Sequence, residues 1–323
     1  MCTAISFKTR DHYFGRNLDL EFSYNETVSV TPRNFPFKFR CKGDVSSHPA
    51  MIGMAYVQNG YPLYYDCTNE YGLSIAGLNF PGYADYKEID PEKHNIAPFE
   101  MIPWVMCNCK NVSEAKLLLE KTNIAKINFS DDLPASPLHW MISDRDRSIV
   151  CESTEEGLKL YDNPFDVMTN NPPFNYHLLN LSNYMNCTRE EAVSRFSDRL
   201  ELKAFSRGMG SFGIPGDLSS ASRFVKAAFT LLNSECGEAE EESVPHFMHI
   251  LGSVYQQQGC CRVGSKFEYT IYSSCCNTDK GIYYYNTYNN PAINAVEMHH
   301  ENLDGSEVIS YPLNDKMSVN FSN

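Results

Sequence analysis

The chain has 323 residues, and its 42% hydrophobic and 21% charged content is typical of a soluble globular protein. A formal net charge of −13 disfavours nucleic acid as a partner, because binding to phosphates calls for a basic surface. No signal-peptide pattern opens the chain, and no apolar run approaches the roughly 18 residues of a membrane span. We therefore expect a cytoplasmic protein in which the 12 cysteines act mostly as small apolar residues.

The chain begins Met1-Cys2, and a cysteine in second position is small enough to permit removal of the initiator methionine. The mature chain would then start at Cys2, which would carry both a thiol and a free α-amine. Their ordinary pKa values are roughly 8.5 and about 7.7–8.0, so both groups exchange protons near neutrality. Such a residue can act as a nucleophile with its own general base. The simpler alternative is a small buried residue in an edge strand.

Two strands are expected next, at residues 5–7 and 13–22, joined by a turn at 9–12. Alternation places Leu18 and Leu20 on one face of the second strand, and Asp19 on the other. Arg16 would share the apolar face, where an unpaired charge is costly. Arg16 and Asp19 are therefore candidates to flank the Cys2 thiol and amine. The alternative for Asp19 is a solvated sheet face.

The middle of the chain predicts a polar connection at 38–49, followed by strands at 51–57, 62–67 and 73–78. A tight turn at 77–82 contains Asn79, where a backbone N–H can remain free. Helices are expected at 97–109 and at 112–122, the second capped by Ser113. The proline-rich stretch 129–138 is a loop whose apolar residues could line a ligand site.

Strands at 139–143, 148–152, 158–161 and 166–169 follow, and the last one runs directly into Asn170. Helical patterns cover 178–184, 189–200, a stretch from about 219 to 232, and 246–255, with an acidic surface loop at 235–242. Arg223 falls in the first turns of its helix, where a cation opposes the helix dipole, and this unfavourable placement indicates another role for it. The last strands are expected at 267–273, 281–288 and 292–298. None of the cysteine clusters has zinc-site spacing, so no metal is expected.

Five motifs follow one another along the chain: Met1-Cys2-Thr3, Gly15-Arg16-Asn17-Leu18-Asp19, Gly77-Leu78-Asn79-Phe80-Pro81, Thr169-Asn170 and Ala221-Ser222-Arg223-Phe224. In this order they resemble the choloylglycine hydrolase family, and within it the bile salt hydrolase branch. The similarity covers essentially the whole chain. Further matching stretches are His139-Trp140-Met141-Ile142-Ser143-Asp144 and the tyrosine-rich run at 281–288.

The resemblance implies an α+β fold, the αββα sandwich of N-terminal nucleophile hydrolases, in a single domain over residues 2–323 after loss of Met1. It implies that Cys2 is the nucleophile and that its α-amine moves the proton. Asp19 would hold the amine, and Arg16 and Arg223 would lie around the thiol. The oxyanion hole would combine the Asn79 backbone N–H with the Asn170 side chain. No metal or cofactor is implied.

The implied reaction is hydrolysis of the amide that joins a steroid acid to glycine or taurine, through a thioester on Cys2. By the same resemblance, the apolar substrate contacts are Leu18, Tyr65, Phe129, Leu133 and Leu138, with Asn79 beside them. The resemblance also implies a homotetramer that uses an extended segment near 186–214. The closest alternative activity is that of a penicillin V acylase. Asn79 favours the bile salt branch, because penicillin V acylases often have an aromatic residue there.

Overall fold

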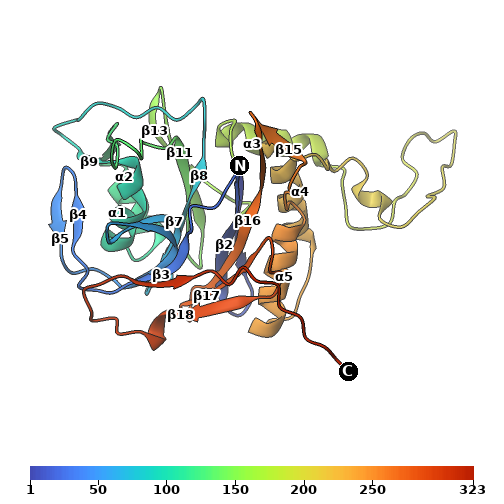
Figure 1. Cartoon of the computed structure of the whole chain (residues 1–323). Coiled ribbons are helices and arrows are strands. Elements are labelled where there is room, and N and C mark those ends of the chain that lie inside the picture. Colours follow the sequence, from blue (N-terminus) through green and yellow to red (C-terminus); the bar gives the residue numbers. More distant parts are fainter.

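The computed structural model describes all residues from Met1 to Asn323, and it contains two large antiparallel sheets stacked face to face (Figure 1). Sheet I has the strand order β14-β1-β2-β16-β17-β18, with β15 added beside β16. Its strands are β1 (Cys2–Lys8), β2 (His12–Leu20), β14 (Val167–Met168), β15 (Cys261–Val263), β16 (Lys266–Asn277), β17 (Ile282–Thr287) and β18 (Asn294–Glu297).

Sheet II has the order β13-β12-β11-β8-β7-β6-β3-β19. Its strands are β3 (Thr27–Thr31), β6 (Met51–Gln58), β7 (Tyr61–Asn69), β8 (Ser74–Asn79), β11 (Leu138–Ser143), β12 (Ser148–Thr154), β13 (Gly157–Asp162) and β19 (Ile309–Pro312). Two small sheets lie outside this pair and consist of β4 (Phe37–Phe39) with β5 (Gly43–Val45), and β9 (His94–Ile96) with β10 (Thr122–Ile124).

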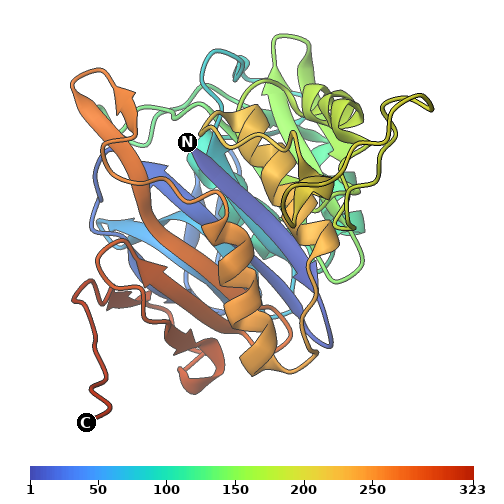
Figure 2. The same cartoon turned by 90° about the vertical axis from the view of Figure 1, so that its right-hand side faces the viewer.

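Helices cover the outer face of each sheet. The helices α1 (Met101–Asn108) and α2 (Val112–Leu119) pack on sheet II, and α3 (Phe174–Asn180), α4 (Ser220–Asn233) and α5 (Glu240–Gly252) lie on the side of sheet I. Figure 2 shows α4 and α5 lying across β1, β2 and β16. Short 3₁₀ turns complete the chain at η1 (Pro98–Glu100), η2 (Leu181–Tyr184), η3 (Met209–Ser211) and η4 (Met298–His300). The predicted αββα sandwich is confirmed.

The helix that carries Arg223 forms where the sequence predicts it. Ser219 is the N-cap and accepts a hydrogen bond from the Ser222 backbone N–H. Phe224, Ala227 and other apolar residues at helical spacing face sheet I and are buried. Arg223 is thereby fixed in the helical layer that covers sheet I, directly over the start of β1.

The prediction of a helix at 189–200 is wrong. Residues 188–217 contain only the short turn η3, and the segment extends away from the body of the molecule (Figure 1). Most of its large apolar side chains find no packing partner in the chain, as Phe196 shows with 81% of its surface exposed. Because most helical stability comes from packing an apolar face, the local pattern alone does not form a helix here.

Smaller differences have local causes. The connection at 38–49 contains the β4–β5 hairpin. Asn111, not Ser113, caps α2 by accepting from the Glu114 backbone N–H, and Leu117 faces solvent. The acidic stretch expected as a loop continues into the first turn of α5, where the positive end of the helix dipole favours carboxylates.

Candidate active site

Cys2 is the first residue of β1 and faces the space between the sheets. In the β1–β2 ladder it lies opposite Leu18, and Ala4 lies opposite Arg16, so these four side chains share one face of sheet I. Only 2% of Cys2 is exposed, and the residue lies at the wall of a cavity between the two sheets. The thiol is therefore positioned for a reactant that enters this cavity.

Met1 is present in the chain as described, so the nitrogen of Cys2 is a peptide N–H. The Met1 ammonium donates to the Asp19 backbone oxygen at 2.8 Å and forms an ion pair with Glu268. Burial lowers the pKa of this ammonium. A proton-shuttling α-amine on Cys2 requires that Met1 be removed, and this removal stays a prediction.

Asn170 connects the separate catalytic candidates. Its Oδ1 accepts from the Cys2 N–H at 2.7 Å and from Arg223 Nη2 at 2.7 Å. Its Nδ2 donates to the Asn79 backbone oxygen at 2.7 Å, which leaves a second amide hydrogen on the same nitrogen. These three bonds fix which end of the amide is the donor. Asn170 can therefore present an N–H beside Cys2.

Arg223 holds the backbone around Cys2. Its Nη1 donates to the Cys2 carbonyl and to Thr3 Oγ1 at 2.7 Å, while its Nε donates to the Leu218 carbonyl at 3.0 Å. Burial lowers the pKa of Arg223, and the nearby Asp19 and Cys2 oppose this change. The guanidinium is thus placed behind Cys2, on the helix side of sheet I.

Arg16 approaches from the other side, where β7 and β8 separate. The β7–β8 pairing ends at Asp66 and Ala76, and the next two carbonyls, of Tyr65 and Gly77, both accept from Arg16 Nη1 at 3.0 and 2.5 Å. Arg16 therefore closes the split between two strands of sheet II although it belongs to sheet I. The split leaves room for the cavity in front of Cys2.

Asp19 does not lie on a solvated face. It is completely buried, and its Oδ1 accepts from Thr270 Oγ1 at 2.6 Å. Its Oδ2 has no hydrogen-bond partner. Burial raises the pKa of Asp19, and Arg223 and the N-terminal ammonium act against this rise. A carboxylate oxygen without a partner, this close to the chain terminus, is suited to hold the α-ammonium that Cys2 would carry after removal of Met1.

Asn79 is the last residue of β8 and pairs with Leu138 of β11. The following residue, Phe80, donates its N–H to the Pro137 carbonyl at 2.8 Å. Because backbone groups alternate in direction along a strand, the Asn79 N–H points away from β11, on the same side as the Asn79 carbonyl that Asn170 contacts. The predicted free donor is compatible with this geometry.

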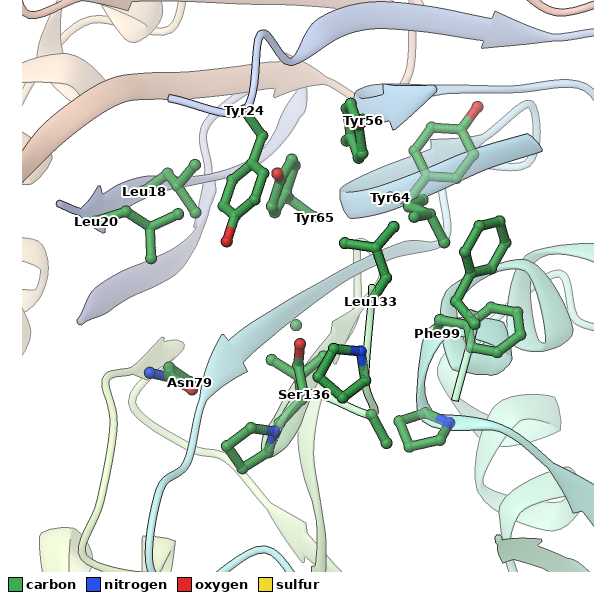
Figure 3. A pocket seen from close by; sticks show the side chains of 18 of the residues that line it. Leu18, Leu20, Tyr24, Tyr56, Tyr64, Tyr65, Asn79, Phe99, Leu133 and Ser136 are labelled. Carbon is green, nitrogen blue, oxygen red and sulfur yellow. The ribbon is translucent and has the colours of Figure 1, made fainter. Parts of the chain in front are cut away.

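The cavity has a volume of about 450 Å³ and is predominantly apolar. Figure 3 shows Leu18, Leu20 and Tyr65 on the side of β2 and β7, with Leu133 across from them and Asn79 at the lower left. All the predicted substrate contacts line it: Leu18, Tyr65, Asn79, Phe129, Leu133 and Leu138. The proline-rich loop supplies much of the outer wall.

Several further groups at this site are not among the residues predicted from the sequence. Leu20 and Tyr24 line the cavity, and alternation with Leu18 could have identified Leu20. Thr270 contacts Asp19 from β16, more than 240 residues away along the chain, and Glu268 of the same strand pairs with the Met1 ammonium, which the mature chain would lack. Only the pairing of β16 with β2 brings them there, so no local pattern signals their role.

Fold and site define the class: an αββα sandwich whose first strand begins at a cysteine is an N-terminal nucleophile hydrolase. The chain belongs to the choloylglycine hydrolase family of linear amide C–N hydrolases, whose family model matches residues 2–311. It is therefore an enzyme that hydrolyses amides. None of its helices combines the length and apolar character needed to cross a bilayer.

Several named relatives are similar to this chain over nearly its full length. The bile salt hydrolase/transferase of Lactiplantibacillus plantarum is 55% identical over 314 residues, covering 97% of each chain. The bile salt hydrolase/transferase of Clostridium perfringens is 40% identical, and the whole of both chains is covered. A crystal structure of the C2A mutant of conjugated bile acid hydrolase from Clostridium perfringens superimposes with a TM-score of 0.92 at 38% identity and full coverage of both chains. Penicillin V acylase from Agrobacterium tumefaciens shares the fold, with a TM-score of 0.75 at 17% identity, covering 96% of this chain and 90% of that one.

Proposed function

We propose that this enzyme hydrolyses the amide bond of glycine- or taurine-conjugated bile salts. The observation that carries the proposal is the apolar cavity that ends at Cys2 and Asn79, between Leu18 and Tyr65 on one wall and Leu133 on the other. A pocket of this size with apolar walls and few polar groups suits a largely apolar ligand such as a steroid. The names of the full-length relatives point to the same substrates.

Acylation begins at Cys2 after Met1 has been removed. The α-amine takes the thiol proton, and the thiolate attacks the amide carbonyl carbon, forming the C–S bond. The negative oxygen is held by the Asn170 amide and the Asn79 backbone N–H, each contributing typically a few kcal/mol. When the C–N bond breaks, the α-amine returns the proton, and glycine or taurine leaves as the free amine.

Deacylation uses the same groups in the opposite sense. Water loses a proton to the α-amine and attacks the thioester carbonyl, and the Cys2 thiolate leaves. The bile acid then departs and the thiol regains its proton. In the mature chain, Asp19 holds the α-ammonium through its unpaired Oδ2. Arg16 lines the same cavity as Cys2 and places its positive charge on the cavity side of the sulfur.

We also propose a homotetramer in the cytoplasm. The shape of segment 186–214 supports this proposal, because the segment extends from the body of the molecule and exposes large apolar side chains such as Phe196, Phe205 and Phe212. Isolated apolar residues on a surface are common, but several on one projecting segment suit a contact with other copies. Sedimentation equilibrium would return the mass of four chains, whereas a monomer mass would contradict the assembly.

The function is tested by supplying the purified enzyme with glycocholate, taurocholate and phenoxymethyl penicillin in parallel, and measuring the amine product of each. We expect release of glycine or taurine by the wild type and none by Cys2→Ala. Cleavage of phenoxymethyl penicillin alone would reassign the enzyme to the penicillin V acylase activity. An active Cys2→Ala variant would remove Cys2 from the mechanism.

A further inference from the structure

The backbone that carries Asn170 is held by two buried histidines to which the mechanism gives no role. His139 Nε2 lies 2.9 Å from the Thr169 carbonyl oxygen, and His177 Nε2 lies 3.0 Å from the Asn170 carbonyl oxygen. Both acceptors are carbonyls, so both Nε2 atoms donate. The Asn170 N–H donates in turn to Ser220 Oγ at 2.9 Å. Three backbone groups of this turn, the Thr169 carbonyl and the Asn170 N–H and carbonyl, are therefore anchored.

Each histidine also stacks on a phenylalanine that directly follows another catalytic candidate. The His139 ring lies 4.3 Å from the Phe80 ring with 7° between the planes, and Phe80 follows Asn79. The His177 ring lies 4.8 Å from the Phe224 ring with 22° between the planes, and Phe224 follows Arg223. Two imidazoles thus connect three separate segments of the chain.

The surroundings keep both Nε2 donors in place. Burial lowers the pKa of His177 to about 4, so the ring is neutral at physiological pH and its single proton lies on Nε2. The Nδ1 of His139 faces Glu152 Oε1 at 3.0 Å, and Glu152 also accepts from the Phe174 backbone N–H at 3.0 Å. This fixes the His139 ring from its other side.

We propose that His139 and His177 are positioning residues that hold the Asn170 amide at the distance the oxyanion requires. The inference rests on the role of Asn170 in the proposed function. Without the Nε2 donor, a buried carbonyl beside Asn170 loses its partner, and the turn relaxes to recover one. The Asn170 side chain moves with the turn. Misplacement of a catalytic group by about 1 Å can lower the rate by about 100-fold.

The test compares two variants at His177. His177→Phe keeps a ring to stack on Phe224 but has no donor, whereas His177→Gln keeps an N–H at the same reach and loses the stack. We expect His177→Phe to lower kcat by about 10- to 100-fold with KM within about threefold, and His177→Gln to recover most of kcat. The rate of Cys2 alkylation should remain that of the wild type.

His48 offers a matched control. It is also buried, its Nε2 lies 2.9 Å from the Phe35 carbonyl oxygen, and its ring lies 5.0 Å from that of Phe37. His48 Nδ1 also lies 2.8 Å from the Pro49 carbonyl oxygen, so His48→Phe likewise removes a ring donor to a carbonyl, but away from Asn170. It should lower thermal stability by a similar amount and leave kcat unchanged. An equal loss of kcat in His48→Phe would mean that the effect reports general softening of the fold.

A double-mutant cycle with Asn170→Ala decides whether His177 acts through Asn170. If it does, His177→Phe adds little further loss in the Asn170→Ala background. A wild-type kcat in His177→Phe, or an undiminished loss in the Asn170→Ala background, overturns the inference. If His177→Phe does not fold, His177→Asn, whose amide is too short to reach the carbonyl, takes its place.

Failure of the proposed function would look different. A wild type inactive on conjugated bile salts contradicts the substrate assignment, and the same cycle can be run on phenoxymethyl penicillin. Full activity in Asn170→Ala contradicts the oxyanion assignment itself, and the positioning role falls with it. Loss of activity in Asn170→Ala with no effect at His177 or His139 contradicts only the positioning role.

Discussion

Arg16→Met tests how the split between β7 and β8 is held. The substitution keeps the length and the apolar stem of the side chain and removes the guanidinium. The Tyr65 and Gly77 carbonyls then lose the donor that both share. Asp66, completely buried and bonded to Tyr272 and Tyr283, loses a neighbouring cation.

The size of the effect follows from these contacts. Hydrogen bonds from a charged donor contribute about 1.5–3 kcal/mol each, and removing one member of a buried charge pair costs about 3–5 kcal/mol. Burying a guanidinium is itself unfavourable, and its removal returns part of this cost. We expect the free energy of unfolding to fall by about 3–5 kcal/mol. We also expect a changed rate of Cys2 alkylation, because the cavity in front of the thiol depends on the split that Arg16 holds.

Urea denaturation followed by tryptophan fluorescence measures the first effect, and iodoacetamide labelling followed by mass spectrometry measures the second. The informative control is Arg16→Met combined with Asp66→Asn. If Asp66 is the charge that Arg16 balances, the second substitution restores about 1–3 kcal/mol. A single variant as stable as the wild type, or a double variant less stable than the single one, would refute the reasoning.

Three further outcomes are expected. Burial lowers the pKa of His12 from 6.5 to about 4, so the stability that neutral His12 confers is complete above pH 6.5 and is lost as pH falls towards 4. Relative to His12→Gln, the wild type should lose about 2 kcal/mol of unfolding free energy between pH 7 and pH 5, measured by urea titration. Parallel pH curves for the two proteins would contradict this. Leu133→Ala should raise KM for glycocholate about 10-fold with little change in kcat, because the cavity loses an apolar contact. The control Leu117→Ala, on the exposed side of α2, should alter neither constant. A loss confined to kcat in Leu133→Ala would count against a substrate-binding role for Leu133. A chain with glutamate inserted between Met1 and Cys2 should fold with a wild-type melting curve and hydrolyse no bile salt, and activity in that chain would show that a free Cys2 amine is unnecessary.

Local sequence patterns predicted the structure correctly where one face of a strand or helix packs against a neighbouring sheet or helix layer. The alternation in 13–22 predicted that Leu18 and Leu20 share a face, and Arg16 does fall on that face. The capping serine and apolar spacing also located the helix that carries Arg223. In each case the burial pattern has the same period as the local structure, so the sequence alone reports it.

Other features depend on contacts between distant segments. Asp19 has the local pattern of a solvated residue, and only the pairing of β2 with β16 buries it against Thr270. Conversely, residues 189–200 have a helical pattern but no surface to pack on, and no helix forms. The substrate wall required the resemblance to a family, because a proline-rich loop has no periodicity from which side-chain direction could be predicted.

The proposed mechanism depends on a thioester on a mature N-terminal Cys2. Rapid acid quenching of the enzyme with glycocholate, followed by intact and peptide mass analysis, tests this most directly. We expect a chain that lacks Met1 and carries one cholyl group on the Cys2 peptide during turnover, with the adduct absent in Cys2→Ala. Turnover by a chain that retains Met1, or an acyl group on a peptide without Cys2, would contradict it.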